Sequence, residues 1–447
     1  MAWRNVCGAA AVLALLGLIA TPVWASETAE ATAEQPQAEP SPEVWDVHAR
    51  ALMNSGHLDA ADAVLDARLA IEPGDVQARF LKGLIAMARG DNRRAIGLFR
   101  SILIDHPNAT RVRLELARAF YNVKDYGNAR RQFQFALAGK LPPEVTANIN
   151  RYMASIRDAK SLSFTVGIAV APDSNLNTGS SAREVTLFGL PFDLSDDARG
   201  RSGVGLAVEA GTEWAPRIGH GKRLRLGFNI QRREYAGSEF DDMTAAAYAG
   251  PRVVTGRWDL SVLGTAYMRW YGGRRYNSAL GGRVEATYHL SNRLELSAAL
   301  GMQSLRFQRT PARGGPLFFL NASGFYALSP SSGTTLKLGI SRQNARAAGF
   351  SSWSGFVAAG YYKDLPMGFS AYVEPSLSVS RYDAALFGFD RPRADTTGSL
   401  LLTLLNRHLA LGRFTPRISY TYTQQYSSVS LYVFSRHRVE IGLTTTF

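Results

Sequence analysis

Two things are scarce in this sequence, and each shortage excludes a class of protein. Its 447 residues contain a single cysteine, Cys7, so no disulfide can form within the chain, and thiol catalysis and cysteine metal sites are also excluded if Cys7 is removed with a signal peptide. Beyond the N-terminal segment, no stretch has the roughly 20 consecutive apolar residues that a membrane helix requires. If the chain spans a membrane, it must therefore do so as a β-barrel.

Residues 1–25 have the features of a secretory signal peptide. A short segment with Arg4 precedes an apolar run, and Val23 and Ala25 are small residues at the two positions that signal peptidase reads. Cys7 lies at the front of that run, so cleavage after Ala25 would remove it. We therefore expect an exported protein without cysteine.

Lysine and arginine are absent from residues 26–43, where five glutamates and three prolines lie among alanines. Such a composition buries too little apolar surface to offset the entropy of ordering, so this segment is predicted to be a disordered acidic linker. The whole chain is nevertheless basic, with a net charge of +13. Because export places this charge outside the cytoplasm, nucleic acid is excluded as a partner.

Residues 44–160 contain an internal period of 34 residues. Alanines recur in register, with a large apolar residue four positions later and a small residue twelve positions earlier. This pattern resembles the tetratricopeptide repeat, which implies an all-α solenoid of paired helices. Residues 145–156 have helical apolar spacing and are predicted to cap the stack. The repeated positions are Ala61, Ala95 and Ala129; Leu65, Phe99 and Phe133; and Ala49, Gly83 and Ala117.

Beyond Lys160 the hydrophobic period changes from helical to two. Residues 222–233 and 258–270 alternate apolar with polar side chains, and Trp258 and Trp270 lie where barrels have aromatic girdles. Tight turns and longer loops alternate between fourteen such segments, which predicts a 14-stranded antiparallel transmembrane β-barrel over residues 161–447. The segments are centred near residues 167, 209, 228, 249, 264, 283, 300, 322, 339, 358, 374, 402, 419 and 441.

The predicted fold is therefore multi-domain, with the all-α solenoid followed by the barrel. An even number of strands returns the chain to its starting side, so the solenoid and the C-terminus should both be periplasmic, with the barrel in the outer membrane. We expect separate cores, so that the barrel inserts without the solenoid. Arginines in the lumen are expected to pair with carboxylates, and a cationic lumen is the alternative. The carboxylates are Asp259, Glu295, Glu374 and Glu440.

No motif in the sequence indicates catalysis. Its seven histidines form no pair at metal-ligand spacing, and no serine has the flanking glycines of a nucleophile elbow. A hydrolase could assemble a triad from separate strands, but the residues identify none. We predict no enzymatic activity, no cofactor and no metal.

The end of the chain resembles the signal that the barrel assembly machinery recognises in its clients. In that signal a polar residue is followed two positions later by glycine, and the last residue is aromatic. Glu440, Gly442 and Phe447 match, whereas Thr445 occupies a position that is usually apolar. The expected partners of the barrel are this machinery, outer-membrane lipid and lipopolysaccharide.

A polar motif follows the first predicted strand: Pro172, Asp173, Ser174, Asn175, Leu176 and Asn177. Proline interrupts a ladder, and Asp and Asn bond their own backbone, so the motif ends the strand. With a short repeat domain before it and a 14-stranded barrel behind it, the motif resembles the surface lipoprotein assembly modulator family. The resemblance implies an outer-membrane translocon that delivers periplasmic lipoproteins, or related host-binding proteins, to the cell surface. A polysaccharide export porin is the alternative, although its repeat arrays are usually longer.

The repeats also imply a binding groove for the client lipoprotein or secreted polypeptide. In repeats of this type the first helix of each hairpin commonly lines a groove that holds an extended peptide. A mixed apolar and cationic groove suits an unfolded or acidic polypeptide, and packing between hairpins is the alternative role of these side chains. The positions are Gln77, Phe80, Leu84 and Met87 in the second repeat, and Arg111, Leu114, Arg118 and Tyr121 in the third.

Overall fold

The computed structural model describes residues 44–159, 162–411 and 414–445. The predicted signal peptide, the predicted acidic linker and Phe447 lie outside these residues. No helix in the described part of the chain is long and apolar enough to cross a membrane. The helices are α2 (Val44–Asn54), α3 (Leu58–Ile71), α4 (Val76–Ala88), α5 (Asn92–Asp105), α6 (Thr110–Asn122), α7 (Tyr126–Ala136) and α8 (Pro143–Ala159).

Helix α2 pairs with α3, and α6 pairs with α7, because the 34-residue period places small side chains between paired helices. Aspartate side chains cap α5 and α7: Asp91 accepts the N–H of Arg94 at 3.0 Å, and Asp125 accepts that of Asn128 at 3.3 Å. Complete burial at the repeated positions confirms the predicted repeats, as seen for Ala61, Ala95, Ala129, Leu65, Phe99 and Phe133.

Two compact units divide the described residues, the first ending at Ile85 and the second beginning at Ala86. The first contains α2, α3 and most of α4. Its Asp75 carboxylate caps α4 by accepting the N–H of Ala78 at 2.9 Å, and Arg68 donates to it at 2.7 Å. Burial would raise the pKa of Asp75, but these hydrogen bonds and the Arg68 charge lower it below its ordinary value.

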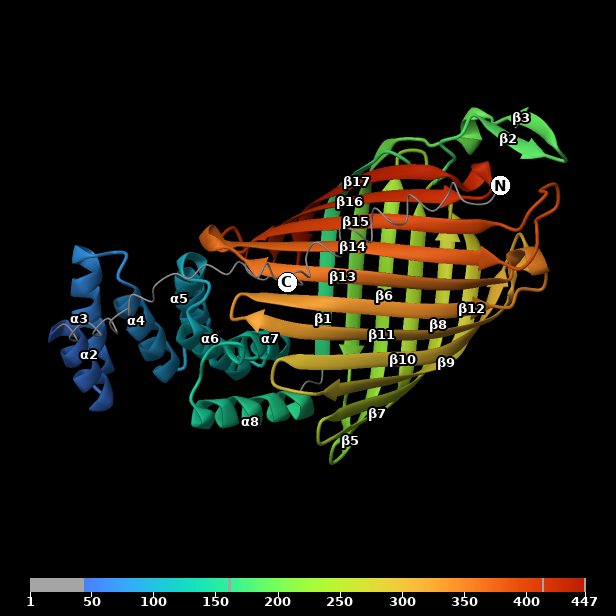
Figure 1. The fold of residues 1–447 in the computed structure, drawn as a ribbon. Coiled ribbons are helices and arrows are strands. Elements are labelled where there is room, and N and C mark those ends of the chain that lie inside the picture. The colour runs from blue at the N-terminus through green and yellow to red at the C-terminus, as the bar shows by residue number, and fades with distance from the viewer. Residues whose placement is uncertain (1–43, 160–161, 412–413, 446–447) are drawn as a thin grey trace, which may run out of the picture. The chain divides into compact units, whose positions relative to one another are not determined.

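The strands belong to the second unit and form a closed antiparallel barrel (Figure 1). They are β1 (Leu162–Asp173), β2 (Glu184–Leu187), β3 (Leu190–Asp193), β4 (Gly203–Trp214), β5 (Arg217–Gly219), β6 (Lys222–Tyr235), β7 (Asp242–Thr255), β8 (Trp258–Tyr271), β9 (Arg274–His289), β10 (Leu294–Phe307), β11 (Gly315–Ser329), β12 (Ser332–Gln343), β13 (Ser352–Asp364), β14 (Phe369–Tyr382), β15 (Ala394–Asn406), β16 (Thr415–Ser427) and β17 (Phe434–Thr444). In the fifteen-stranded sheet β5 only extends a turn, so the other fourteen form the ring, as predicted. β1 closes it by pairing with both β4 and β17.

The outer face of the barrel is apolar because alternate side chains of each strand point outward. On β1, Phe164, Ile168 and Val170 are exposed, whereas Ala169 and Ala171 between them are buried. Exposed apolar rows on a closed barrel face the hydrocarbon of a membrane. The alternate positions, many of them polar or small, face the lumen.

Most connections follow the predicted alternation of short periplasmic turns and longer outer loops, with exceptions at both ends of the barrel. Because the helices precede β1, the barrel end where β1 begins is periplasmic. The longest outer connection, residues 174–202, contains the β2–β3 hairpin, which lies beyond the strand ends in Figure 1. At the outer end, Gly272 and Gly273 both have positive φ and close a two-residue turn between β8 and β9. At the periplasmic end, the connection of residues 407–414 between β15 and β16 is longer than the outer loop of residues 236–241.

Candidate functional site

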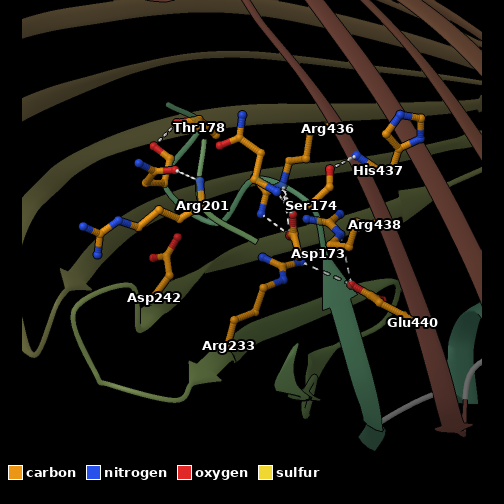
Figure 2. Close-up of polar contacts among 12 residues, drawn as sticks. Asp173, Ser174, Thr178, Arg201, Arg233, Asp242, Arg436, His437, Arg438 and Glu440 are labelled. Atoms are coloured by element: carbon orange, nitrogen blue, oxygen red, sulfur yellow. Dashed lines mark hydrogen bonds and ion pairs between the residues drawn. The ribbon is translucent and has the colours of Figure 1, made fainter. Parts of the chain in front are cut away.

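The predicted polar motif forms a buried, hydrogen-bonded loop where β1 ends (Figure 2). The Asp173 side chain is fully buried, and its two oxygens accept from Arg436 Nε at 2.9 and 3.0 Å. Asp173 also accepts the backbone N–H of Asn175 at 3.0 Å, which fixes the turn after the strand. Since Arg436 belongs to β17, the motif connects the first strand of the barrel to the last.

The two asparagines of the motif order the loop that follows. Asn175 Nδ2 donates to the carbonyl oxygens of Gly179 at 3.0 Å and Ser435 at 3.2 Å, while its Oδ1 accepts the Gly179 N–H at 2.8 Å. Asn177 Nδ2 donates to the Arg199 carbonyl at 2.7 Å. Beyond the end of the β1 ladder, the two side-chain amides therefore bind backbone groups in place of a neighbouring strand.

Charged side chains in the lumen pair as predicted, but three arginines share one carboxylate. Arg233, Arg417 and Arg438 approach Glu440 with nitrogen–oxygen distances of 3.7, 3.3 and 3.4 Å. Figure 2 shows Arg233 and Arg438 pointing to Glu440 from different strands. Positive charge is therefore in excess around Glu440. Asp259 pairs with Arg252 as predicted, whereas the partner of Glu374 is Lys337 and not an arginine.

At the periplasmic end, the second unit contains a buried ion pair that the sequence did not predict. Arg113 on α6 donates to the Asp364 carboxylate, at the end of β13, at 3.0 Å. Arg113 is 1% exposed, and the Asp364 side chain is fully buried. Arg407 pairs with the other carboxylate oxygen at 2.9 Å, and the hydroxyls of Tyr362 and Ser370 donate to the same oxygen. Asp364 is therefore completely coordinated by groups from the helices and the barrel.

Burial makes this pair costly to separate. Burial lowers the pKa of the Arg113 guanidinium, and the Asp364 charge opposes that shift. Burial also lowers the pKa values of Arg100 and Arg131 on the neighbouring helices. Arg113 also donates a hydrogen bond to Gln132 Oε1 at 2.7 Å, which holds the guanidinium in place. A buried charge that loses its partner costs about 3–5 kcal/mol, so removing either partner would destabilise the junction between helices and barrel.

An apolar cluster surrounds this ion pair. Phe135 on α7 stacks on Tyr362 with ring centroids 5.6 Å apart, and meets Phe325 edge-on at 6.2 Å. Buried Ala138 and Ala327 complete the cluster. The prediction of separate cores for solenoid and barrel is therefore wrong, because α7 covers aromatic side chains of β11 and β13 that would otherwise face water.

Glu295 also differs from its predicted role at this end of the barrel. Instead of a lumen arginine, its partners are Arg130 on α7 and His289 on β9, the latter at 3.2 Å. Arg293 in the same turn donates to the Leu137 carbonyl at 3.3 Å. The β9–β10 turn is therefore a second place where the helices contact the barrel.

The predicted groove positions of the second repeat lie mostly in the first unit. Phe80 is 3% exposed, which excludes it from an open groove because it packs inside the unit. Gln77 and Leu84 are partly buried, and Gln77 is within 3.4 Å of Asp46. Met87, the first of the predicted positions in the second unit, is also partly buried.

The third-repeat positions lie on α6, and the structure covers one of them. The Tyr121 ring packs edge-on against Tyr152 of α8, with centroids 5.0 Å apart, so the capping helix occupies this part of the face. Arg111 is exposed and Leu114 is partly buried. Arg118 pairs with Glu115 at 2.9 Å and keeps 43% of its side chain exposed.

Of the predicted assembly signal, Glu440 and Gly442 lie on β17, and Phe447 lies outside the described residues. A Cβ on Gly442 would lie 1.9 Å from the Ile168 carbonyl oxygen and 2.5 Å from the Ala169 Cα. Only glycine fits where β17 crosses β1 this closely. A side chain at position 442 would therefore push β1 and β17 apart.

Comparisons with known proteins agree with this architecture. Residues 163–447 match the family described as surface lipoprotein assembly modifier, and residues 47–110 and 83–144 match the tetratricopeptide repeat. The "Surface lipoprotein assembly modifier" of Moraxella catarrhalis is 23% identical over 78% of this chain and 69% of its own length. "Surface lipoprotein assembly modifier 1" of Haemophilus influenzae is 20% identical over 79% of this chain and 74% of its own.

Solved structures give a weaker likeness. A loop-deletion mutant of OmpT, an outer membrane protein of Vibrio cholerae, is 7% identical and has a TM-score of 0.37, covering 64% of this chain and 99% of that chain. The lipid-facing barrel places this chain in the outer membrane, with its repeats on the periplasmic side. The family match covers well over half of the chain and includes both the polar motif and the closing strand. This chain therefore belongs to the surface lipoprotein assembly modifier family.

Proposed function

We propose that this chain delivers lipoproteins from the periplasm to the cell surface, with the helices as receiving domain and the barrel as conduit. Family membership supports a role in surface lipoprotein assembly, since the relatives are named for it. The observation that carries the finer proposal is the buried Arg113–Asp364 pair, which fixes α6 to the periplasmic end of the barrel. A receiving domain held in this way can pass a polypeptide to the barrel without dissociating from it.

The α6 face suits capture of an unfolded or acidic polypeptide. Arg111, Leu114 and Arg118 are spaced by three and four residues, so they share one face of the helix. Arg111 is exposed, and the Arg118 side chain, which pairs with Glu115, is 43% exposed. We assign client capture to these three positions and leave out Tyr121, which α8 covers.

The proposal includes partners of the barrel itself. The assembly machinery would recognise the closing strand, in which Glu440 and Gly442 occupy the signal positions. Lipopolysaccharide would contact outward cations at the outer rim, such as Arg232 near the end of β6, whose side chain is 47% exposed. No reaction and no cofactor belong to this proposal.

Deleting the gene and restoring it tests the function. Lipoproteins labelled metabolically with an alkyne-bearing fatty acid should lose protease accessibility at the surface of the deletion strain and regain it when the full chain is restored. Glycan staining of the same cells should not change. Altered glycan with unchanged lipoprotein display would contradict the proposal and favour polysaccharide export.

A charge reversal tests the α6 face in the full chain. Arg111→Glu with Arg118→Glu should reduce surface display of the same lipoproteins while the barrel stays folded, because exposed positions contribute little to stability. Arg93→Glu with Arg94→Glu changes the charge equally at exposed positions of α5 and is the matched control. Equal display from both variants would remove client capture from α6.

A further inference from the structure

The ladder between β1 and β17 is the shortest in the ring of described strands. It pairs residues 167–170 with residues 441–444, and then only Asp173 with Arg438. On its other side, every residue of β1 pairs with β4 without interruption. The first strand is therefore held far less firmly to the last strand than to its other neighbour.

Local sequence explains this weak seam, which we define as the contact between β1 and β17. Pro172 lies in the interrupted part and has no N–H to donate to a ladder. Gly167, Ala169 and Ala171 are buried on the lumen face of β1, and Gly442 faces them from β17. Large side chains therefore do not interlock the two strands on that face. As the first and last strands of the barrel, they are also the neighbours that no turn connects.

Polar side chains hold the outer end of the seam instead of a continuous ladder (Figure 2). Asp173 binds Arg436, and Asn175 donates to the Ser435 carbonyl at 3.2 Å. Ser174 accepts the His437 N–H at 2.8 Å through its hydroxyl oxygen, and its own N–H donates to the His437 carbonyl at 2.9 Å. These side-chain contacts join only the ends of β1 and β17, so breaking them leaves the ladders between all other strands in place.

The outer face of the seam is apolar on both sides. Ile168 and Val170 of β1 and Ile441 of β17 are exposed large apolar side chains at or next to registered positions. A lipoprotein has acyl chains, and each CH₂ group of such a chain gains about 0.8 kcal/mol on entering a membrane. Passage of these chains through a polar lumen and around the outer rim would expose them to water.

We propose that β1 and β17 separate transiently and that the acyl chains of a lipoprotein client leave the barrel sideways through this seam into the outer membrane. The proposal rests on the proposed function and adds the route taken by the lipid part of the client. Opening here frees fewer backbone groups than opening any other ladder of the ring, and freed backbone groups are the main cost in lipid.

Cross-linking the seam tests this route. Val170→Cys with Ile441→Cys places one cysteine on each strand at registered, outward positions. Val262→Cys with Val284→Cys does the same across β8 and β9 and is the matched control. Because Cys7 is the only native cysteine, a short reducible bis-methanethiosulfonate reagent should join only the intended pairs.

Two probes distinguish the lipid from the polypeptide. The first is a lipoprotein whose surface display the deletion strain loses, and the second is the same protein with its acylated cysteine replaced by serine behind a soluble signal peptide. A cross-linked seam should abolish display of the first probe and leave release of the second intact. Reduction should restore display, and the β8–β9 cross-link should have no effect.

Normal display of the acylated probe through a fully cross-linked seam would overturn the lateral route, and so would equal loss of both probes. Failure of the uncross-linked chain to restore any lipoprotein to the surface would instead contradict the proposed function.

Discussion

Each end of the barrel contains a buried aspartate paired with an arginine, and we expect the two ion pairs to have different roles. At each end a fully buried aspartate side chain at the end of a strand binds an arginine from a distant part of the sequence: Asp364 binds Arg113, and Asp173 binds Arg436. The periplasmic pair lies under an aromatic cluster and has a second arginine, Arg407. The difference lies in the first arginine, since Arg113 is 1% exposed and Arg436 is 19% exposed, whereas Arg407 is 17% exposed.

The more deeply an ion pair is buried, the more free energy its separation costs, so burial determines which ion pairs can open during transport. A charge enclosed by protein on all sides loses several kcal/mol when its partner leaves, whereas a charge that water can reach is partly compensated. We expect the periplasmic pair to hold the helices on the barrel throughout transport, and the outer pair to be the one that opens.

The largest loss of stability should come from breaking the ion pair between Arg113 and Asp364. Asp364→Ala leaves Arg113 and Arg407 buried without a counter-charge, at a cost of about 3–5 kcal/mol. Limited trypsin digestion of the purified protein in detergent should then separate helices from barrel, while the barrel remains heat-modifiable. Asp383→Ala removes an exposed aspartate that pairs with Arg342 and should leave digestion unchanged. Equal resistance of wild type and Asp364→Ala would show that the pair does not fix the helices.

A smaller effect is expected at the outer end. Asp173→Asn keeps the side-chain size but removes the charge that Arg436 binds, which should cost about 1.5–3 kcal/mol. Protease should then cleave the loop of residues 174–202 more readily in whole cells, with the periplasmic junction unaffected. Asp196→Asn, an exposed position in the same loop, is the control. If Asp173→Asn released the solenoid from the barrel, the two ion pairs would not have the separate roles that we expect.

The smallest effect should follow from widening the seam itself. Gly442→Ala forces β1 and β17 apart because of the Ile168 carbonyl, at a cost of at least about 1 kcal/mol. The amount of heat-modifiable barrel should fall. Gly398→Ala on β15 is the control, since a Cβ there would meet no described atom within 4 Å. Similar yields from the two variants would mean that the seam tolerates the added methyl group.

Sequence patterns predicted the features whose signals are local. The repeat alanines and the fourteen strands show a regular period, and each position in a period supports the others. The polar motif was recognisable because its turn-forming residues are contiguous. Its bond to Arg436 was not, because register between the first and last strands depends on how the whole barrel closes.

The periplasmic junction could not be predicted because its two charges are far apart in the chain. Arg113 and Asp364 are 251 residues apart, and each is ordinary where it stands. One local sign existed: Arg113 follows Val112 and precedes Leu116 on the buried stripe of α6, where an arginine needs a partner. The expectation of separate cores failed for the same reason, since Phe135 and Tyr362 meet only in the folded chain.

The shared core also determines the order in which this protein becomes complete. Secretion delivers the N-terminus first, so α6 and α7 emerge and fold before the strands that contain Phe325, Tyr362 and Asp364. Until then Phe135 remains uncovered, and Arg113 has no carboxylate from the barrel. An early intermediate therefore presents an apolar and cationic surface to the periplasm, and periplasmic chaperones have a defined patch to protect. Insertion of the barrel into the membrane ends that exposure, because β11 and β13 then cover Phe135 and supply Asp364 to Arg113.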